Sequence, residues 1–157
     1  MTPVAALTDR FAIVDLLHRY ATGLDTRDWD KLASVFTHDG VADYGALGGV
    51  NEGPAAIVKL CSGALEGLDA SQHIISNEVI EVDGDRARAR CYFKAQHVFR
   101  GAEGGDNFLV GGTYEDEIVR TAEGWRIERR TLTATWTDGN PVVFEAAAAR
   151  LAAKSAH

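Results

Sequence analysis

The sequence predicts an α+β fold in which a curved, antiparallel or mixed β-sheet wraps over three N-terminal helices, with one pocket between them. Two observations carry this prediction. Apolar residues recur at helical spacing up to about residue 65, and from Ser71 onward they alternate with polar residues instead. Turn-forming stretches at 83–85 and 101–107 separate the alternating segments, so that successive strands can pair antiparallel.

Three helices are expected before the sheet. Thr8 can cap a first helix that runs to about Gly23, because glycine is a common stop signal. The apolar positions of this helix are Phe11, Val14, Leu17 and Ala21. Asp28 can cap a second, shorter helix, and Pro54 suits the first turn of a third. A short strand bounded by glycines is expected at 40–47, between the second and third helices.

The clearest strand spans 86–99. One face carries Ala87, Ala89, Cys91, Phe93, Ala95, His97 and Phe99, and the other carries Arg86, Arg88, Arg90, Lys94 and Gln96. The first face therefore points inward. Further strands are expected at 108–121 and 125–136. We expect residues 1–143 to form a single domain, and the Ala-rich segment 144–157 to form a terminal helix or a frayed tail.

Composition argues against several classes of partner. The net charge is −7 and the basic residues are scattered, whereas nucleic-acid binding needs clustered Lys and Arg. Cys61 and Cys91 lack metal-type or disulfide-framework spacing and are embedded in apolar sequence, which is typical of reduced core thiols. No signal peptide is visible, and no segment approaches the roughly 20 apolar residues that span a bilayer. We expect a cytoplasmic protein that binds a small molecule rather than a membrane.

A few polar residues could carry chemistry. His97 lies on the inward face of its strand, where it could be a functional group or a core histidine satisfied by one hydrogen bond. His73 begins another strand, Asp25 follows the first helix and Tyr44 ends the short strand. A neutral imidazole beside a buried carboxylate can act as a base, because the carboxylate fixes its tautomer and stabilises the imidazolium. Spacing alone does not show that these four residues converge.

Neither a metal nor a cofactor is predicted. No pair of histidines has the i,i+2 or i,i+4 spacing that is typical of metal ligands. The glycine-rich stretch 101–107 lacks the following helix and the Lys-Ser/Thr pair of a phosphate-binding loop. We expect this stretch to form a rim over the pocket mouth instead.

Four motifs resemble the SnoaL-like branch of the nuclear-transport-factor-2-like superfamily, which forms cone-shaped α+β domains. "LDTRDWDKL" is similar to the segment in which scytalone dehydratases carry a catalytic Asp, here Asp25. "VADY" is similar to the strand that bears their active-site Tyr, here Tyr44. "SQHIIS" matches their base, here His73, and "FKAQH" places a second active-site histidine at His97.

Two further positions come from other members of the superfamily. The stretch "GGTYEDEIVRTAEGWRIERR" resembles hexachlorocyclohexane dehydrochlorinase and places its active-site Arg at Arg130. Strand alternation leaves the direction of Arg130 open, because Ile127 falls on the opposite face unless a bulge shifts the register. Bile-acid dehydratases of this superfamily have a Tyr five residues before the Asp, which matches Tyr20. Leu24 stands where scytalone dehydratase has a second Tyr, and its pocket Asn falls near Tyr114.

The resemblance implies a cofactor-independent lyase that catalyses β-elimination, chiefly dehydration, on a small cyclic, aromatic or polycyclic substrate. In that reading His73 removes an acidic C–H proton. Asp25 orients the His73 ring and balances the positive charge that the ring gains. Arg130 or Tyr44 would hold the oxygen on which negative charge develops.

The same resemblance leaves some roles and alternatives open. Either His97 or Tyr20 would protonate the departing hydroxyl. The same residues would also suit an isomerase, a cyclase or a cofactorless C–C lyase that releases formaldehyde. A non-catalytic small-ligand carrier is the other possibility, and it would need an apolar pocket rather than one containing imidazoles, a carboxylate and a guanidinium. The resemblance further implies a homotrimer.

Overall fold

The computed structural model describes residues 2–156, which form four α-helices and a six-stranded mixed sheet. The helices are α1 (Pro3–Thr26), α2 (Trp29–Ser34), α3 (Pro54–Leu65) and α4 (Val142–Ser155), with a 3-10 turn, η1, at Gly45–Leu47. The strands are β1 (Phe36–Asp43), β2 (Val50–Glu52), β3 (Ala70–Asp83), β4 (Arg86–Val98), β5 (Asn107–Thr121) and β6 (Gly124–Gly139).

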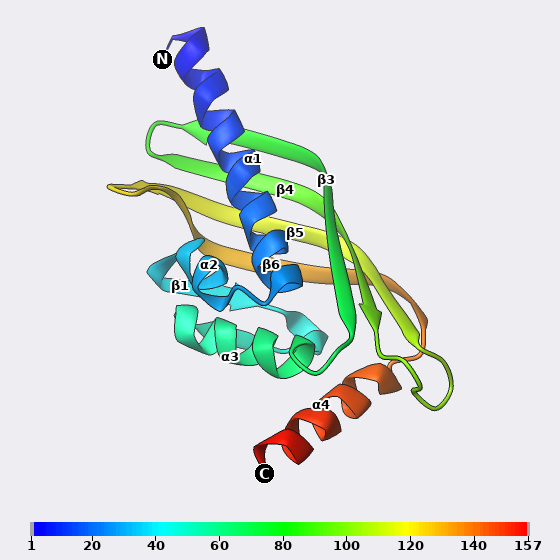
Figure 1. Ribbon diagram of the computed structural model, residues 1–157. Coiled ribbons are helices and arrows are strands. Elements are labelled where there is room, and N and C mark those ends of the chain that lie inside the picture. The colour runs from blue at the N-terminus through cyan, green and yellow to red at the C-terminus, as the bar shows by residue number, and fades with distance from the viewer. Residues whose placement is uncertain (1, 157) are drawn as a thin grey trace.

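The sheet has the strand order β2-β1-β6-β5-β4-β3. Neighbouring strands are antiparallel except β1 and β6, which pair in parallel. Helices α1, α2 and α3 cover one face of this curved sheet, whereas α4 lies at its lower end (Figure 1). The buried side chains gather between the inner face of the sheet and the helices. The predicted α+β fold with a mixed sheet wrapped over three N-terminal helices is therefore confirmed.

The first helix begins and ends elsewhere than predicted. Thr2 is its cap, accepting a hydrogen bond from the Ala5 N–H at 3.3 Å, so the predicted cap at Thr8 is wrong. Gly23 lies within the helix and not at its end. A Cβ there would lie 3.0 Å from the backbone nitrogen of Leu32, so the glycine allows α2 to pack closely on α1. The helix ends three residues later because Arg27 adopts a left-handed conformation with φ of 57°.

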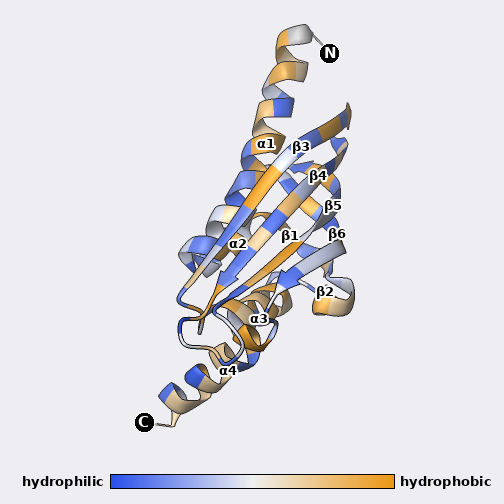
Figure 2. Cartoon of the chain, turned by 90° about the vertical axis from the view of Figure 1, so that its right-hand side faces the viewer, coloured by the Kyte–Doolittle hydropathy of each residue, from blue (hydrophilic) through white to orange (hydrophobic). Residues whose placement is uncertain are grey.

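The buried stripe of α1 agrees with the prediction at Leu17 and Ala21 but not at Phe11. Phe11 is 63% exposed, because the first turns of the helix project beyond the strands (Figures 1 and 2). The residues that enter the core are Ile13, Leu16, Leu17, Tyr20, Ala21 and Leu24. Although α1 is long, no helix within residues 2–156 is both long and apolar enough to cross a membrane.

The other helices follow the sequence signals closely. Asp28 caps α2, accepting a hydrogen bond from the Lys31 N–H at 2.9 Å, and α3 begins at Pro54. The Ala-rich segment forms an ordered helix, α4, in which Val143 and Ala147 are fully buried. Of the two predictions for this segment, the terminal helix is the one that the structure contains.

A bulge in β6 decides the direction of Arg130. Glu117 pairs with Arg129 and Ile118 pairs with Ile127, so Glu128 is an extra residue on β6. The extra residue reverses the alternation at this point. Ile127 and Arg130 therefore both point inward, and both are fully buried.

Candidate active site

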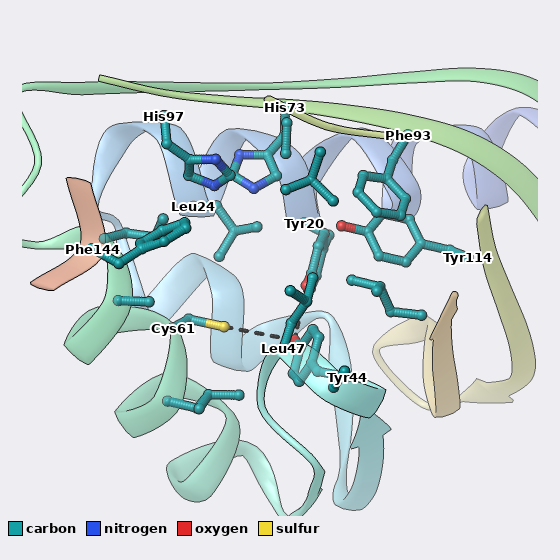
Figure 3. Close-up of a pocket in the computed structure, with 17 residues that line it drawn as sticks. Tyr20, Leu24, Tyr44, Leu47, Cys61, His73, Phe93, His97, Tyr114 and Phe144 are labelled. Carbon is teal, nitrogen blue, oxygen red and sulfur yellow. Dashed lines mark hydrogen bonds between the residues drawn. The ribbon is translucent and has the colours of Figure 1, made fainter. Parts of the chain in front are cut away.

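A cavity of about 360 Å³ lies between the inner face of the sheet and the helices. Its lining is mainly apolar, and none of the described lining residues is Asp, Glu, Lys or Arg. The lining residues are Tyr20, Leu24, Tyr44, Ala46, Leu47, Leu60, Cys61, Ala64, Leu65, His73, Phe93, Ala95, His97, Val110, Tyr114, Leu132 and Phe144. The two imidazoles lie side by side in the wall, while the tyrosines and Cys61 group at a distance from them (Figure 3).

His73 and Asp25 form a closely hydrogen-bonded pair. Asp25 lies in the last turn of α1 and His73 lies near the start of β3. The His73 Nδ1 is 2.6 Å from the Asp25 Oδ1, and the His73 backbone N–H donates to Oδ2 at 2.7 Å. Helix α1 continues past Gly23 to Thr26, and this continuous helix places the Asp25 carboxylate against β3.

The surroundings of Asp25 keep it ionised. Burial opposes its charge, but the hydrogen bonds from the His73 ring and backbone and from Ser71 outweigh burial and lower its pKa. An ionised Asp25 accepts the hydrogen on His73 Nδ1, which leaves the other ring nitrogen, Nε2, free to take a proton. His73 lines the cavity, whereas Asp25 lies behind it and faces an outer groove of about 390 Å³.

His97 lies in β4 with its ring centroid 5.7 Å from that of His73, and the two rings are nearly perpendicular. Its Nδ1 is 3.2 Å from the carbonyl oxygen of Phe108, so Nδ1 carries the hydrogen and donates it. Burial and the neighbouring His73 lower the pKa of His97 to about 4. His97 is therefore a neutral imidazole near pH 7, and its Nε2 is a hydrogen-bond acceptor.

Two phenols and a thiol are linked by hydrogen bonds on another part of the wall. The hydroxyl oxygens of Tyr20 and Tyr44 are 2.8 Å apart, and the Cys61 thiol donates to Tyr44 at 3.6 Å (Figure 3). Burial is the main cause that raises the pKa of both phenols well above the usual value. One phenol hydrogen lies in the bond between the two hydroxyls, so the other phenol is the one that can donate to a ligand, and neither readily gives up its proton.

Arg130 does not line the cavity. It is fully buried and makes two hydrogen bonds to Asp116, from Nε at 2.7 Å and from Nη2 at 2.8 Å. Its guanidinium lies between the rings of Tyr20 and Tyr114, 4.0 and 4.1 Å from their centroids. Burial would lower the pKa of Arg130, but the carboxylate of Asp116 outweighs burial and raises it. The cation therefore supports two tyrosines of the wall from behind.

The sequence analysis gave no role to Asp116 or Phe144, and it named Tyr114 only as the position near which a pocket Asn of scytalone dehydratase falls. Asp116 and Tyr114 lie on the inward face of β5, where alternation with Ile118 could have identified them. Phe144 of α4 also lines the cavity, with its ring centroid 4.8 Å from that of His97. None of the described lining residues comes from 101–107, the stretch predicted to form the rim.

The chain matches the family of SnoaL-like domains over residues 5–131. It is 38% identical over 133 residues to an uncharacterized protein of Mycobacterium tuberculosis, an alignment that covers 85% of this chain and 90% of that protein. It is also 36% identical over 150 residues to the terrestric acid biosynthesis cluster protein E of Penicillium crustosum, covering 92% of this chain and 93% of that protein.

Solved structures of the same fold include two that the sequence motifs resemble. A type 2 hexachlorocyclohexane dehydrochlorinase superposes with a TM-score of 0.79 at 21% identity, covering 88% of this chain and 93% of that chain. A scytalone-dehydratase-like protein from Novosphingobium aromaticivorans gives a TM-score of 0.78 at 24% identity, covering 88% and 92% of the two chains. The resemblance drawn from the motifs is confirmed, and the chain belongs to the SnoaL-like family of the nuclear-transport-factor-2-like superfamily.

Proposed function

We propose that this protein is a lyase that catalyses β-elimination, most simply the loss of water, from a small neutral cyclic or aromatic substrate. The observation that carries the proposal is the pairing of His73 with Asp25 at 2.6 Å, in the wall of a mainly apolar cavity. An imidazole held by a carboxylate can act as a general base, because the carboxylate fixes its tautomer and stabilises the imidazolium. The mainly apolar lining disfavours water beside the reacting atoms.

In the proposed reaction His73 Nε2 removes a proton from a carbon made acidic by a neighbouring carbonyl or ring. The electrons of the C–H bond form a carbon–carbon double bond, and the C–O bond breaks with its electrons going to oxygen. The imidazolium of His73, stabilised by Asp25, then returns the proton to that oxygen, so that water leaves. Because one imidazole serves both steps, both bonds break on the same face of the substrate.

In this proposal His73 protonates the departing oxygen, whereas the resemblance left that role to His97 or Tyr20. His97 bears its hydrogen on Nδ1, bonded to Phe108, so its Nε2 would accept a hydrogen bond from a substrate hydroxyl. Tyr20 is a weak acid because burial raises its pKa. One phenol of the Tyr20–Tyr44 pair would instead donate a hydrogen bond to the substrate oxygen on which negative charge develops, while the other donates to its partner. Arg130 would act through Tyr20 rather than touch the substrate.

The lining supports a substrate without a carboxylate or phosphate. None of the described lining residues is Lys or Arg, so an anionic substrate would enter without a cationic partner. A volume of about 360 Å³ is at the small end of ligand pockets. An isomerase is the second candidate, because His73 could return the proton to a different carbon instead of to oxygen.

Turnover of a panel of neutral hydroxylated cyclic compounds tests the proposal. We expect His73→Ala and Asp25→Asn to lower kcat roughly 10²–10⁴-fold, as removal of a general base does. His38→Ala is the matched control, because the side chain of His38 is 94% exposed on β1. Release of ¹⁸O-labelled water from a labelled substrate distinguishes elimination from isomerisation. Full turnover by a folded His73→Ala variant would show that the proposal is wrong.

A further inference from the structure

Two residues with no assigned role lie behind the His73–Asp25 pair, here called the dyad, and connect to Asp25. The Ser71 hydroxyl lies 3.1 Å from the Asp25 Oδ1, and the Arg27 Nη1 lies 2.7 Å from the Ser71 Oγ. We propose that Ser71 and Arg27 are positioning residues that hold the Asp25 carboxylate and thereby fix the His73 ring in one tautomer. The proposal rests on the function proposed above, in which His73 is the base.

The direction of each hydrogen bond follows from the groups involved. A guanidinium can only donate, so the Ser71 oxygen accepts from Arg27. The Ser71 hydrogen is then free to point at Asp25, whose oxygens accept it. Asp25 therefore has three donors around it: the His73 ring and Ser71 at Oδ1, and the His73 backbone N–H at Oδ2. Three donors around one carboxyl group favour its ionised form, because an ionised carboxylate is an acceptor only.

The backbone explains how Arg27 reaches this position. It terminates α1 in the left-handed region, and its N–H bonds to the carbonyls of Gly23 and Leu24. Its side chain folds back over the helix end, where Nη1 also donates to the Leu24 carbonyl at 2.6 Å. A cation at a helix C-terminus is favourable. Glycine would suit the backbone here better than arginine, so the contribution of Arg27 lies in its side chain.

The consequence for His73 concerns the choice between two neutral tautomers. Only the tautomer with hydrogen on Nδ1 presents a basic Nε2 to the cavity. A carboxylate free to rotate would give up the 2.6 Å contact for part of the time, and the other tautomer would then be populated. Ser71 blocks that rotation from one side, and Arg27 restrains Ser71 in turn.

Nuclear magnetic resonance of ¹⁵N-histidine-labelled protein tests this without a substrate, because ring ¹⁵N shifts report the tautomer directly. We expect one His73 tautomer in the wild type and a mixture of both in Ser71→Ala. Ser71→Thr keeps the hydroxyl and should restore the single tautomer. If a substrate is found, Ser71→Ala should lower kcat roughly tenfold with little change in KM, as for loss of one hydrogen bond to a charged group.

Arg27→Gly removes the guanidinium and at the same time relaxes a left-handed residue. Asn77→Gly is the matched control, because Asn77 also has a positive φ, 58°, at the bulge in β3 and has no bond to the dyad among those described. We expect Arg27→Gly to populate the second tautomer and Asn77→Gly to leave the spectrum unchanged. The double variant Arg27→Gly/Ser71→Ala should be no worse than Ser71→Ala, because Arg27 acts through Ser71.

The outcomes separate the two proposals. An unchanged His73 tautomer in both Ser71→Ala and Arg27→Gly would overturn the positioning role, whatever the activity of these variants. A wild-type His73 with hydrogen on Nε2 would instead overturn the function proposed above, since Asp25 would then not hold the ring as described. Asp25→Asn provides the reference spectrum for a ring without its carboxylate.

Discussion

Replacing Gly67 with alanine tests how α4 is held against the cavity. Gly67 lies between α3 and β3, and a Cβ on it would be 2.1 Å from the carbonyl oxygen of Ala147 in α4. The carbonyl carbon of the same residue would be 2.7 Å away. Both atoms belong to the backbone of a helix, so no side chain can rotate to make room. Gly67 is not among the glycines with positive φ, and the cost is therefore one of space rather than of backbone strain.

The size of the effect follows from these distances. Helix α4 would have to withdraw by about 1.3 Å to restore an ordinary contact. Val143 and Ala147 are fully buried by the present docking, and the ion pair of Arg150 with Asp69 spans 3.0 Å. Overfilling a packed contact of this kind costs about 1–3 kcal/mol. We expect the free energy of unfolding of Gly67→Ala to fall by that amount.

Gly63→Ala is the matched control, because Gly63 lies in α3 and a Cβ there would meet nothing within 4 Å. Alanine in an exposed helical position should stabilise the protein by about 0.5–1 kcal/mol. Urea unfolding followed by tryptophan fluorescence gives both free energies, and hydrogen exchange of the α4 amides reports where the structure loosens. If Gly67→Ala is as stable as Gly63→Ala and the α4 amides stay protected, the reasoning is refuted.

Three further expectations concern buried or paired charges. The pKa of His97 is lowered to about 4, whereas the unfolded chain titrates near 6.5, so stability is complete above pH 6.5 and is lost as the pH falls. Urea titrations should show a loss of up to about 3 kcal/mol between pH 6.5 and about 4, and His97→Gln should abolish this dependence. Asp116→Asn leaves Arg130 buried and unpaired, and thermal unfolding should show a loss of about 3–5 kcal/mol; a loss under about 1 kcal/mol would contradict a buried pair. Hydrogen bonds from Arg120 lower the pKa of Asp9, so its contribution is present above about pH 4 and is lost as the pH falls through the lowered value. Asp9→Asn should therefore be less stable than the wild type at pH 7 and equal to it in strong acid.

Local patterns predicted the long strands well, but the short strand expected at 40–47 lies at Phe36–Asp43, and β2 was not predicted. Alternation assigned the inward face of β4 correctly, including His97. Apolar residues recur at every second position of this strand, and mostly polar residues lie between them. It did not predict the direction of Arg130, which depends on an extra residue in β6 that pairing with β5 creates. Gly23 was misread because a glycine that ends a helix and a glycine that admits a second helix look the same in sequence.

The family motifs predicted some residues of the candidate site, such as Asp25 and His73, and not others, such as Asp116 and Phe144. Spacing could not bring Asp25 and His73 together, since 48 residues separate them, and the resemblance supplied that pairing. The pairing of Arg130 with Asp116 depends on side chains from two strands, and no local pattern marks it. Phe144 reaches the cavity only because α4 folds back over the end of the sheet, which an Ala-rich segment does not reveal.

Helix α4, which contributes Phe144 to the cavity lining, lies outside the stretch that matches the family. The match ends at residue 131, and Asp25, His73 and His97 all precede that point, whereas Phe144 follows it. The Asp25–His73 pair with His97 and one aromatic wall residue are thus encoded in separate parts of the chain. Replacement of residues 142–155 by a different C-terminal segment would change the shape of the cavity and leave the proposed catalytic pair in place.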